Sequence, residues 1–172
     1  LESEFDMTLR RSFLVTISLG EAIIEKLKLN DTNLKELISL EQTNNQLTNF
    51  CERILNKKGH MDFRKTCFYY VIIWNLEKIC DDYRDLCKLL HNNKINSDLV
   101  VLIQKTNELF VTYYNLFYKF SFKDLVELDK LITELQENIQ TLELTKELYC
   151  LKSINQRIRD FLASTIAINH DR

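Results

Sequence analysis

Two acidic side chains spaced four residues apart in a helix can bind one metal ion. The spacing places both carboxylates on the same face, one turn apart, so their oxygen atoms can reach one site. Glu77 and Asp81 have this spacing. It is a common spacing, because 25 acidic residues in a chain of 172 give about 3.5 such pairs by chance, and the sequence contains five. Most of these pairs are therefore expected to be solvated helix faces.

Position in a predicted helical hairpin distinguishes Glu77 and Asp81 from the other pairs. Two antiparallel helices that turn near Gly59 would bring Glu77 level with position 42. Glu41 and Asn45 flank that position and form a second oxygen-bearing pair. Oxygen ligands without a nearby histidine suit Mg, Mn, Ca or iron. These four side chains are therefore a candidate metal site.

A polar helix edge explains the same residues without a metal ion. Asp81 can pair with Arg84, three residues later, and Glu77 can pair with a neighbouring lysine. Ion pairs on exposed helix faces each contribute well under about 1 kcal/mol to stability. The spacing alone favours this interpretation over a metal site.

The elements that hold these side chains are predicted to be long helices. The chain has no proline and only two glycines, Gly20 and Gly59, so residues that end helices are scarce. Apolar residues recur every three or four positions, as in helices. Asn44 interrupts one apolar stripe and should find a hydrogen-bond partner, because an unpaired buried amide costs about 1 to 3 kcal/mol. Six helices are expected, at about residues 1–29, 33–56, 62–90, 97–120, 121–140 and 143–169.

The six helices divide into two sets of three that are related in sequence. Residues 34–41 read Leu-Lys-Glu-Leu-Ile-Ser-Leu-Glu and residues 122–129 read Phe-Lys-Asp-Leu-Val-Glu-Leu-Asp, identical at three of eight positions. Amphipathic helices rich in leucine, lysine and glutamate can also align by chance. We interpret the match as an internal duplication. It predicts an all-α fold of two antiparallel three-helix bundles, at residues 1–93 and 94–172, packed as one compact domain.

Composition excludes several classes of function. The longest apolar stretch is eight residues, Cys67 to Trp74, whereas a helix needs about 20 to cross a membrane. The net charge of −2 provides no drive toward nucleic acid. The sequence has no Glu-x-x-His pair, which helical di-iron enzymes require, and no Cys-x-x-Cys motif. Five cysteines without a signal peptide indicate a cytoplasmic location and buried thiols. We expect a protein that is not an enzyme.

The segment from Trp74 to Asp81, Trp-Asn-Leu-Glu-Lys-Ile-Cys-Asp, resembles the Leu-Glu-Arg-Ile-Gly/Ala-Asp segment of the PhoU family of phosphate-uptake regulators. An acidic residue followed four positions later by asparagine or aspartate on the preceding helix is also a feature of PhoU repeats. The resemblance implies a multinuclear iron or zinc site on the bundle surface. Its metal residues would be Glu41, Asn45, Glu77 and Asp81 in the first repeat and at most Asp129 and Asp160 in the second, where Thr133 and Gln156 replace the other ligands.

PhoU-like proteins are understood to repress phosphate uptake by binding a phosphate transporter and a sensor kinase. The resemblance therefore implies a cytoplasmic, metal-dependent regulator without catalysis, and we also expect a homodimer. Residues 1–6, followed by Arg10 and Arg11, are similar to the start of archaeal PhoU-like chains that carry a DNA-binding segment upstream. We expect such a segment to be missing here, so that this fragment binds no nucleic acid. The alternative is a metal-free helical interaction or dimerisation module unrelated to phosphate.

Overall fold

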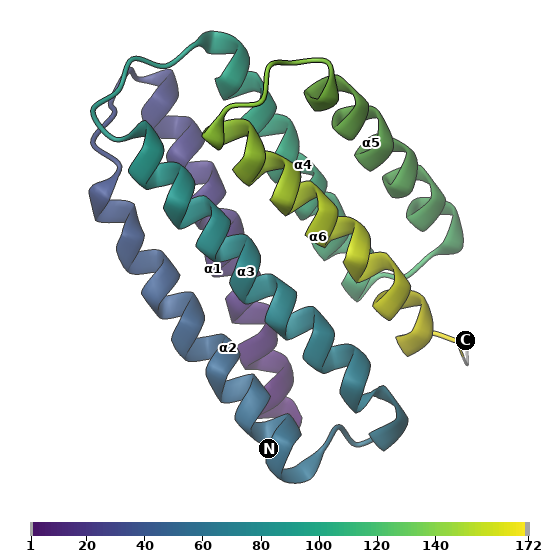
Figure 1. Ribbon diagram of the computed structural model, residues 1–172. Coiled ribbons are helices and arrows are strands. Elements are labelled where there is room, and N and C mark those ends of the chain that lie inside the picture. The colour runs from purple at the N-terminus through teal and green to yellow at the C-terminus, as the bar shows by residue number, and fades with distance from the viewer. Residues whose placement is uncertain (1, 171–172) are drawn as a thin grey trace.

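The computed structural model describes residues 2–170, and within them the chain forms six α-helices, two short 3-10 turns and no strand (Figure 1). The predicted all-α class and the number of helices are confirmed for this range. Residue 1, where the first helix was predicted to begin, and residues 171 and 172 lie outside the described part. The helices are α1 (Glu2–Lys28), α2 (Ile38–Lys58), α3 (Thr66–Leu90), α4 (Ser97–Tyr118), α5 (Phe122–Gln140) and α6 (Lys146–Ile168), and the 3-10 turns are η1 (Lys35–Leu37) and η2 (Phe63–Lys65).

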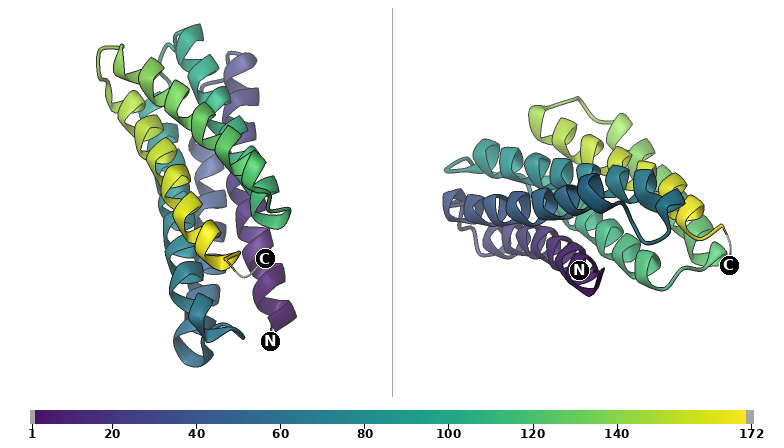
Figure 2. Two further views of the ribbon diagram at one scale, coloured as in Figure 1. Left: turned by 90° about the vertical axis from the view of Figure 1, so that its right-hand side faces the viewer. Right: turned by 90° about the horizontal axis from the view of Figure 1, so that it is seen from below.

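Helices α1, α3, α4 and α6 form the interior of the fold, and α2 and α5 lie on opposite outer edges (Figures 1 and 2). Helix α2 contacts α1 and α3, whereas α5 contacts α4 and α6. The most extensive pairing joins α3 to α6, and α1 also packs on α4. Successive helices run in opposite directions, so both of these pairs are antiparallel. Among the described helices, none combines the length and the apolar character that a membrane span needs.

Several helices begin and end at residues with capping interactions or conformations. Ser121 accepts a hydrogen bond from a backbone N–H in the first turn of α5, and Asp62 accepts one from η2, just before α3. Gly59 follows α2 with a φ of +71°, a left-handed conformation that glycine adopts at low cost. Helix α2 begins at Ile38 and not near residue 33, because the chain first forms η1.

The buried amide of Asn44 ties α2 to α1. Its side-chain NH2 donates to the backbone carbonyl of Ser12 at 3.0 Å and to the hydroxyl of Thr16 at 2.8 Å. The prediction that this residue finds a hydrogen-bond partner is confirmed. The two bonds fix the face of α2 that carries Glu41 and Asn45.

Aromatic packing fixes α1 against the second half of the chain. The Phe13 ring is fully buried, with its centroid 5.3 Å from that of Phe117 in α4 and 6.4 Å from that of Phe161 in α6. Phe161 also stacks on Tyr113 at 4.5 Å. Phe13 therefore anchors α1 to both α4 and α6.

A close approach among α1, α3 and α4 occurs at Gly20, which is buried in the middle of α1. A Cβ atom at this position would lie 2.1 Å from the side-chain oxygen of Asn107, far inside van der Waals contact. That oxygen accepts a hydrogen bond from the buried Tyr83 hydroxyl at 3.1 Å. Glycine is required here because the Asn107 side chain occupies the space of a methyl group.

Four of the five cysteines are buried, as predicted, but Cys67 is exposed, contrary to the expectation for all five. Burial raises the pKa of Cys51, Cys80 and Cys87 to about 12. These three thiols therefore stay protonated at neutral pH and are poor nucleophiles.

Candidate functional site

The chain between α2 and α3 is longer than the sequence predicted, and this changes which residues face each other. It includes η2, so the turn is centred near residue 62 and not at Gly59. The residue of α3 that lies beside a given residue of α2 is therefore about six positions later than predicted, or roughly 9 Å farther along the helix. Glu41 therefore faces Arg84 in α3, and the predicted register, which placed it beside Glu77, was wrong.

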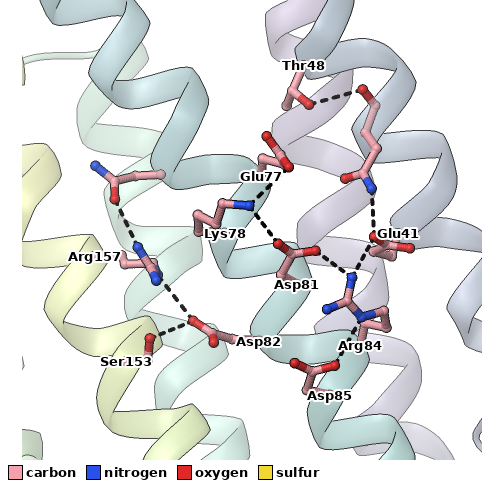
Figure 3. Close-up of polar contacts among 12 residues, drawn as sticks. Glu41, Thr48, Glu77, Lys78, Asp81, Asp82, Arg84, Asp85, Ser153 and Arg157 are labelled. Carbon is pink, nitrogen blue, oxygen red and sulfur yellow. Dashed lines mark hydrogen bonds and ion pairs between the residues drawn. The ribbon is translucent and has the colours of Figure 1, made fainter.

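Arg84 is the centre of a charged cluster between α2 and α3 (Figure 3). Its Nη1 atom donates to Glu41 at 3.0 Å and to Asp81 at 2.6 Å, and its Nε atom donates to Asp85 at 3.0 Å. Asn45 donates to the same Glu41 oxygen at 2.6 Å. The hydrogen bond to Asp85 and the surrounding negative charges raise the pKa of Arg84 further. Three of the predicted metal residues are thus brought together, but around a guanidinium group.

Lys78 connects the fourth predicted residue to this cluster. Its ammonium group lies 3.2 Å from a carboxylate oxygen of Glu77 and 2.9 Å from one of Asp81. The hydrogen bond to Asp81 raises the pKa of Lys78, with a smaller contribution from Glu77. Asp81 therefore sits between two cations, as the polar-edge interpretation predicted for its pairing with Arg84.

Glu52 is a further acidic residue in this region that sequence reasoning missed. Burial raises the pKa of Glu52, and the negative charge of Glu77 raises it further. Its Oε1 atom is buried and has no hydrogen-bond partner among the described residues. The sequence predicted that the helices now seen as α2 and α3 pair as a hairpin. Only the corrected register, however, brings Glu52 close enough to Glu77 for their charges to interact.

Replacing Glu52 with glutamine should stabilise the protein at pH 7 by a few tenths to about 1 kcal/mol, the lower figure reflecting solvent screening. The folded state binds the Glu52 proton more tightly than the unfolded state, so the native carboxyl costs stability as the pH rises above its ordinary pKa of 4.5. The advantage of Glu52→Gln should therefore shrink on acidification and vanish below that value. Urea unfolding of both chains between pH 4 and 7 measures the difference. The exposed Glu134→Gln change is the control, and an advantage that grows on acidification would contradict the assignment.

The two predicted residues of the second set bind different partners. Asp129 in α5 lies 3.3 Å from the Nε atom of Arg159 in α6. The same guanidinium donates to Thr133 and, at 2.8 Å, to Gln136. Asp160 is exposed and accepts a hydrogen bond from Gln156, on its own helix, at 3.0 Å. In this set, as in the first, an arginine of the third helix contacts an oxygen-bearing side chain of the second helix. Here Arg159 of α6 contacts both Asp129 and Thr133 of α5.

A separate polar cluster joins α3 to α6. Asp82 accepts hydrogen bonds from Ser153 at 2.7 Å and from the Nε atom of Arg157 at 3.2 Å (Figure 3). Burial raises the pKa of Asp82, while Ser153 and Arg157 lower it. Arg157 also donates to Asn75 at 3.3 Å and lies 6.0 Å from the centre of the half-exposed Trp74 ring. Sequence reasoning did not find this cluster, because nothing in the sequence identified α6 as the partner of α3.

The arrangement of the first cluster does not fit a multinuclear metal site. The Arg84 guanidinium lies between Glu41 and Asp81, where a shared cation would have to bind. Asn45 directs its amide nitrogen, a donor and not a metal ligand, toward Glu41. Within residues 2–170, no three His, Cys, Asp or Glu side chains are grouped so that they could hold a metal ion. Metal binding would require these side chains to exchange their present partners.

Comparison with known proteins identifies no relative. No family model matches the sequence, and no curated protein or solved structure gives a significant match. The resemblance to PhoU therefore depends on the residues named in the sequence analysis alone.

Proposed function

We propose that this chain is a non-enzymatic helical interaction module that acts in the cytoplasm by binding other protein chains, and that it is built from two three-helix units. Helix contacts support the division at residues 93 and 94. Helices α1, α2 and α3 contact one another, as do α4, α5 and α6. The two sets meet through α1 with α4 and through α3 with α6, so each of these helices packs on its counterpart in the other set.

The observation that carries the interaction role is the use of the acidic motifs as ties between helices. In the first unit Arg84 joins α3 to Glu41 of α2, and in the second unit Arg159 joins α6 to Asp129 of α5. Carboxylates that neutralise arginines within the fold serve its assembly. They are not presented as open acids, bases or ligands. The surface that remains for function consists of exposed helix faces, which suit protein partners.

The second candidate is a metal-dependent, PhoU-like regulator of phosphate uptake, whose partners would be a phosphate transporter or a sensor kinase. One observation favours it beyond the sequence resemblance. The Glu52 oxygen is buried without a hydrogen-bond partner among the described residues and lies close enough to Glu77 for repulsion to raise its pKa. A divalent cation bound by these two carboxylates would relieve that repulsion.

Elemental analysis and thermal unfolding distinguish the two candidates. The metal-free module predicts no stoichiometric metal in the purified protein and an unchanged melting temperature with added Fe, Zn, Mn or Mg. If the protein does bind a metal, a free metal concentration a hundred times the dissociation constant would instead add about 2.7 kcal/mol of stability. That gain should disappear in Glu77→Ala/Asp81→Ala and persist in the matched control Glu134→Ala/Glu137→Ala, on the exposed side of α5. Such a result would replace the first candidate with the second.

A further inference from the structure

The solvent-facing side of α1 carries a regular arrangement of charge. Its exposed residues recur at helical spacing and lie opposite the buried Leu9, Thr16 and Ile23. Leu14, which is 44% exposed, and Ser18 occupy the middle of this face. Six charged positions lie on either side of the middle, Asp6, Arg10, Arg11, Glu21, Glu25 and Lys28, and we call these eight positions together with Met7 the α1 face. Glu4 is also exposed on this side, nearer the N-terminal end of the helix.

The order of charges on the α1 face inverts about its middle. Read from the N-terminus it is negative, positive, positive, then an uncharged centre, then negative, negative, positive. Reversing the helix therefore places an opposite charge at each of these six positions, and Glu4 would lie past the C-terminal end of the partner helix, which ends at Lys28. In an antiparallel pair of α1 helices, Arg10 and Arg11 of one copy would lie opposite Glu21 and Glu25 of the other. The pattern is complementary to itself, as a two-fold symmetric interface requires.

These charges have no ionic partners within the described part of the chain. None of the six forms an ion pair there, whereas Lys26, on another side of α1, pairs with Asp31 and Glu36. Arg10 donates to the Tyr114 hydroxyl at 3.0 Å and lies 5.3 Å from the centre of the Tyr118 ring, so its contacts are with aromatic side chains and not with carboxylates. The α1 face is thus free to pair with charges of another molecule.

A groove beside the C-terminal half of the α1 face offers space for apolar contact. It lies between α1 and α4, has a volume of about 760 Å³, and is lined in part by Ile24, Leu29 and Val111, with Glu108 on its α4 side. In the antiparallel arrangement, Met7 of the second copy would lie over this groove. Met7 is 65% exposed in the single chain, and burying it would add apolar contact to the charge pairing. The two-fold axis would produce this contact twice.

We propose that the α1 face binds a second copy of this chain, forming a closed dimer in which the two α1 helices pack antiparallel with their centre near Ser18. The inference rests on the proposed interaction role and names its partner and surface. Exposed ion pairs contribute little net affinity but select orientation and partner. Dimer formation should therefore weaken as salt concentration rises.

Charge reversal tests this interface in the full chain by sedimentation velocity. The acidic variant Arg10→Glu/Arg11→Glu and the basic variant Glu21→Lys/Glu25→Lys should each weaken dimerisation by about tenfold or more, because like charges then meet across the interface. An equimolar mixture should form a heterodimer, because every opposing pair again has opposite charge. The four changes combined in one chain should restore the homodimer. Lys123→Glu/Lys130→Glu on α5 makes the same change in net charge as the acidic variant and should leave the dimer intact.

Two results would overturn the interface. One is an unchanged chain that stays monomeric at every concentration, and the other is a pair of variants that remain dimeric alone or fail to associate when mixed. Circular dichroism verifies that each variant is folded, which matters because Arg10 also contacts Tyr114. Neither result would contradict the proposed interaction role, because that role is tested separately by elemental analysis and by thermal unfolding with added metal. Recovery of binding in the mixture cannot come from unfolded chains, so the heterodimer is the decisive outcome.

Discussion

A Gly20→Ala chain should unfold roughly 5 to 10 °C below the unchanged protein, although alanine is normally the better helix former. The added Cβ would lie 2.1 Å from the Oδ1 atom of Asn107 and 3.1 Å from the Tyr83 hydroxyl. The Asn107 side chain is only 4% exposed and accepts the Tyr83 hydrogen bond, so it cannot turn away freely. Crowding and a lost buried hydrogen bond each cost about 1 to 3 kcal/mol, which outweighs the gain in helix propensity.

A double-mutant cycle separates this clash from a general effect on the helix. Asn107→Ala alone should destabilise, because it leaves the Tyr83 hydroxyl without its partner, and Gly20→Ala should then add little further cost. Asn115→Ala, on the exposed side of α4, is the control and should change stability by no more than about 0.5 kcal/mol. Thermal unfolding of the four chains measures the coupling. A neutral or stabilising Gly20→Ala would contradict the close approach of α1 and α4.

Helices were predictable from the sequence because their signals are local. Apolar periodicity and cap residues such as Ser121 and Gly59 depend on neighbours within one or two turns. The role of Gly20 was not predictable, because it depends on a side chain of α4 that is remote in sequence. The same limit applied to Asn44, whose need for a partner could be predicted but whose partners in α1 could not.

The candidate site was predictable only at the level of residue types. The pairing of Asp81 with Arg84 follows from helical spacing and is present in the structure. The partner of Glu41 was assigned wrongly, because the three residues of η2 lengthen the loop between α2 and α3. These residues carry no strong turn signal, so the resulting change in register between the two helices was not predictable. Asp82 and Arg157 were missed because their contact joins α3 to α6, and no pattern in a single sequence identifies which helices pack together.

Replacing Arg84 with methionine should lower the free energy of unfolding by about 2 to 3 kcal/mol. Methionine retains much of the packing of the arginine stem but removes the charge that Glu41 and Asp81 share. The Glu41 side chain is only 7% exposed, so its carboxylate would be left buried without a cation. Breaking a buried ion pair on one side costs about 3 to 5 kcal/mol, and the 25% exposure of Arg84 reduces that figure.

A second change at Glu41 should recover most of this loss. In the chain with both Arg84→Met and Glu41→Gln, no buried charge remains unpaired, and Asn45 can still bond to the glutamine oxygen. Lys88→Met removes a nearby but exposed pairing with Asp85 and should cost no more than about 0.5 kcal/mol. Urea unfolding at pH 7 measures all four chains. If Arg84→Met proves as stable as the unchanged protein, Arg84 does not hold these carboxylates in place, and Glu41 and Asp81 become available to a metal ion as the sequence resemblance implied.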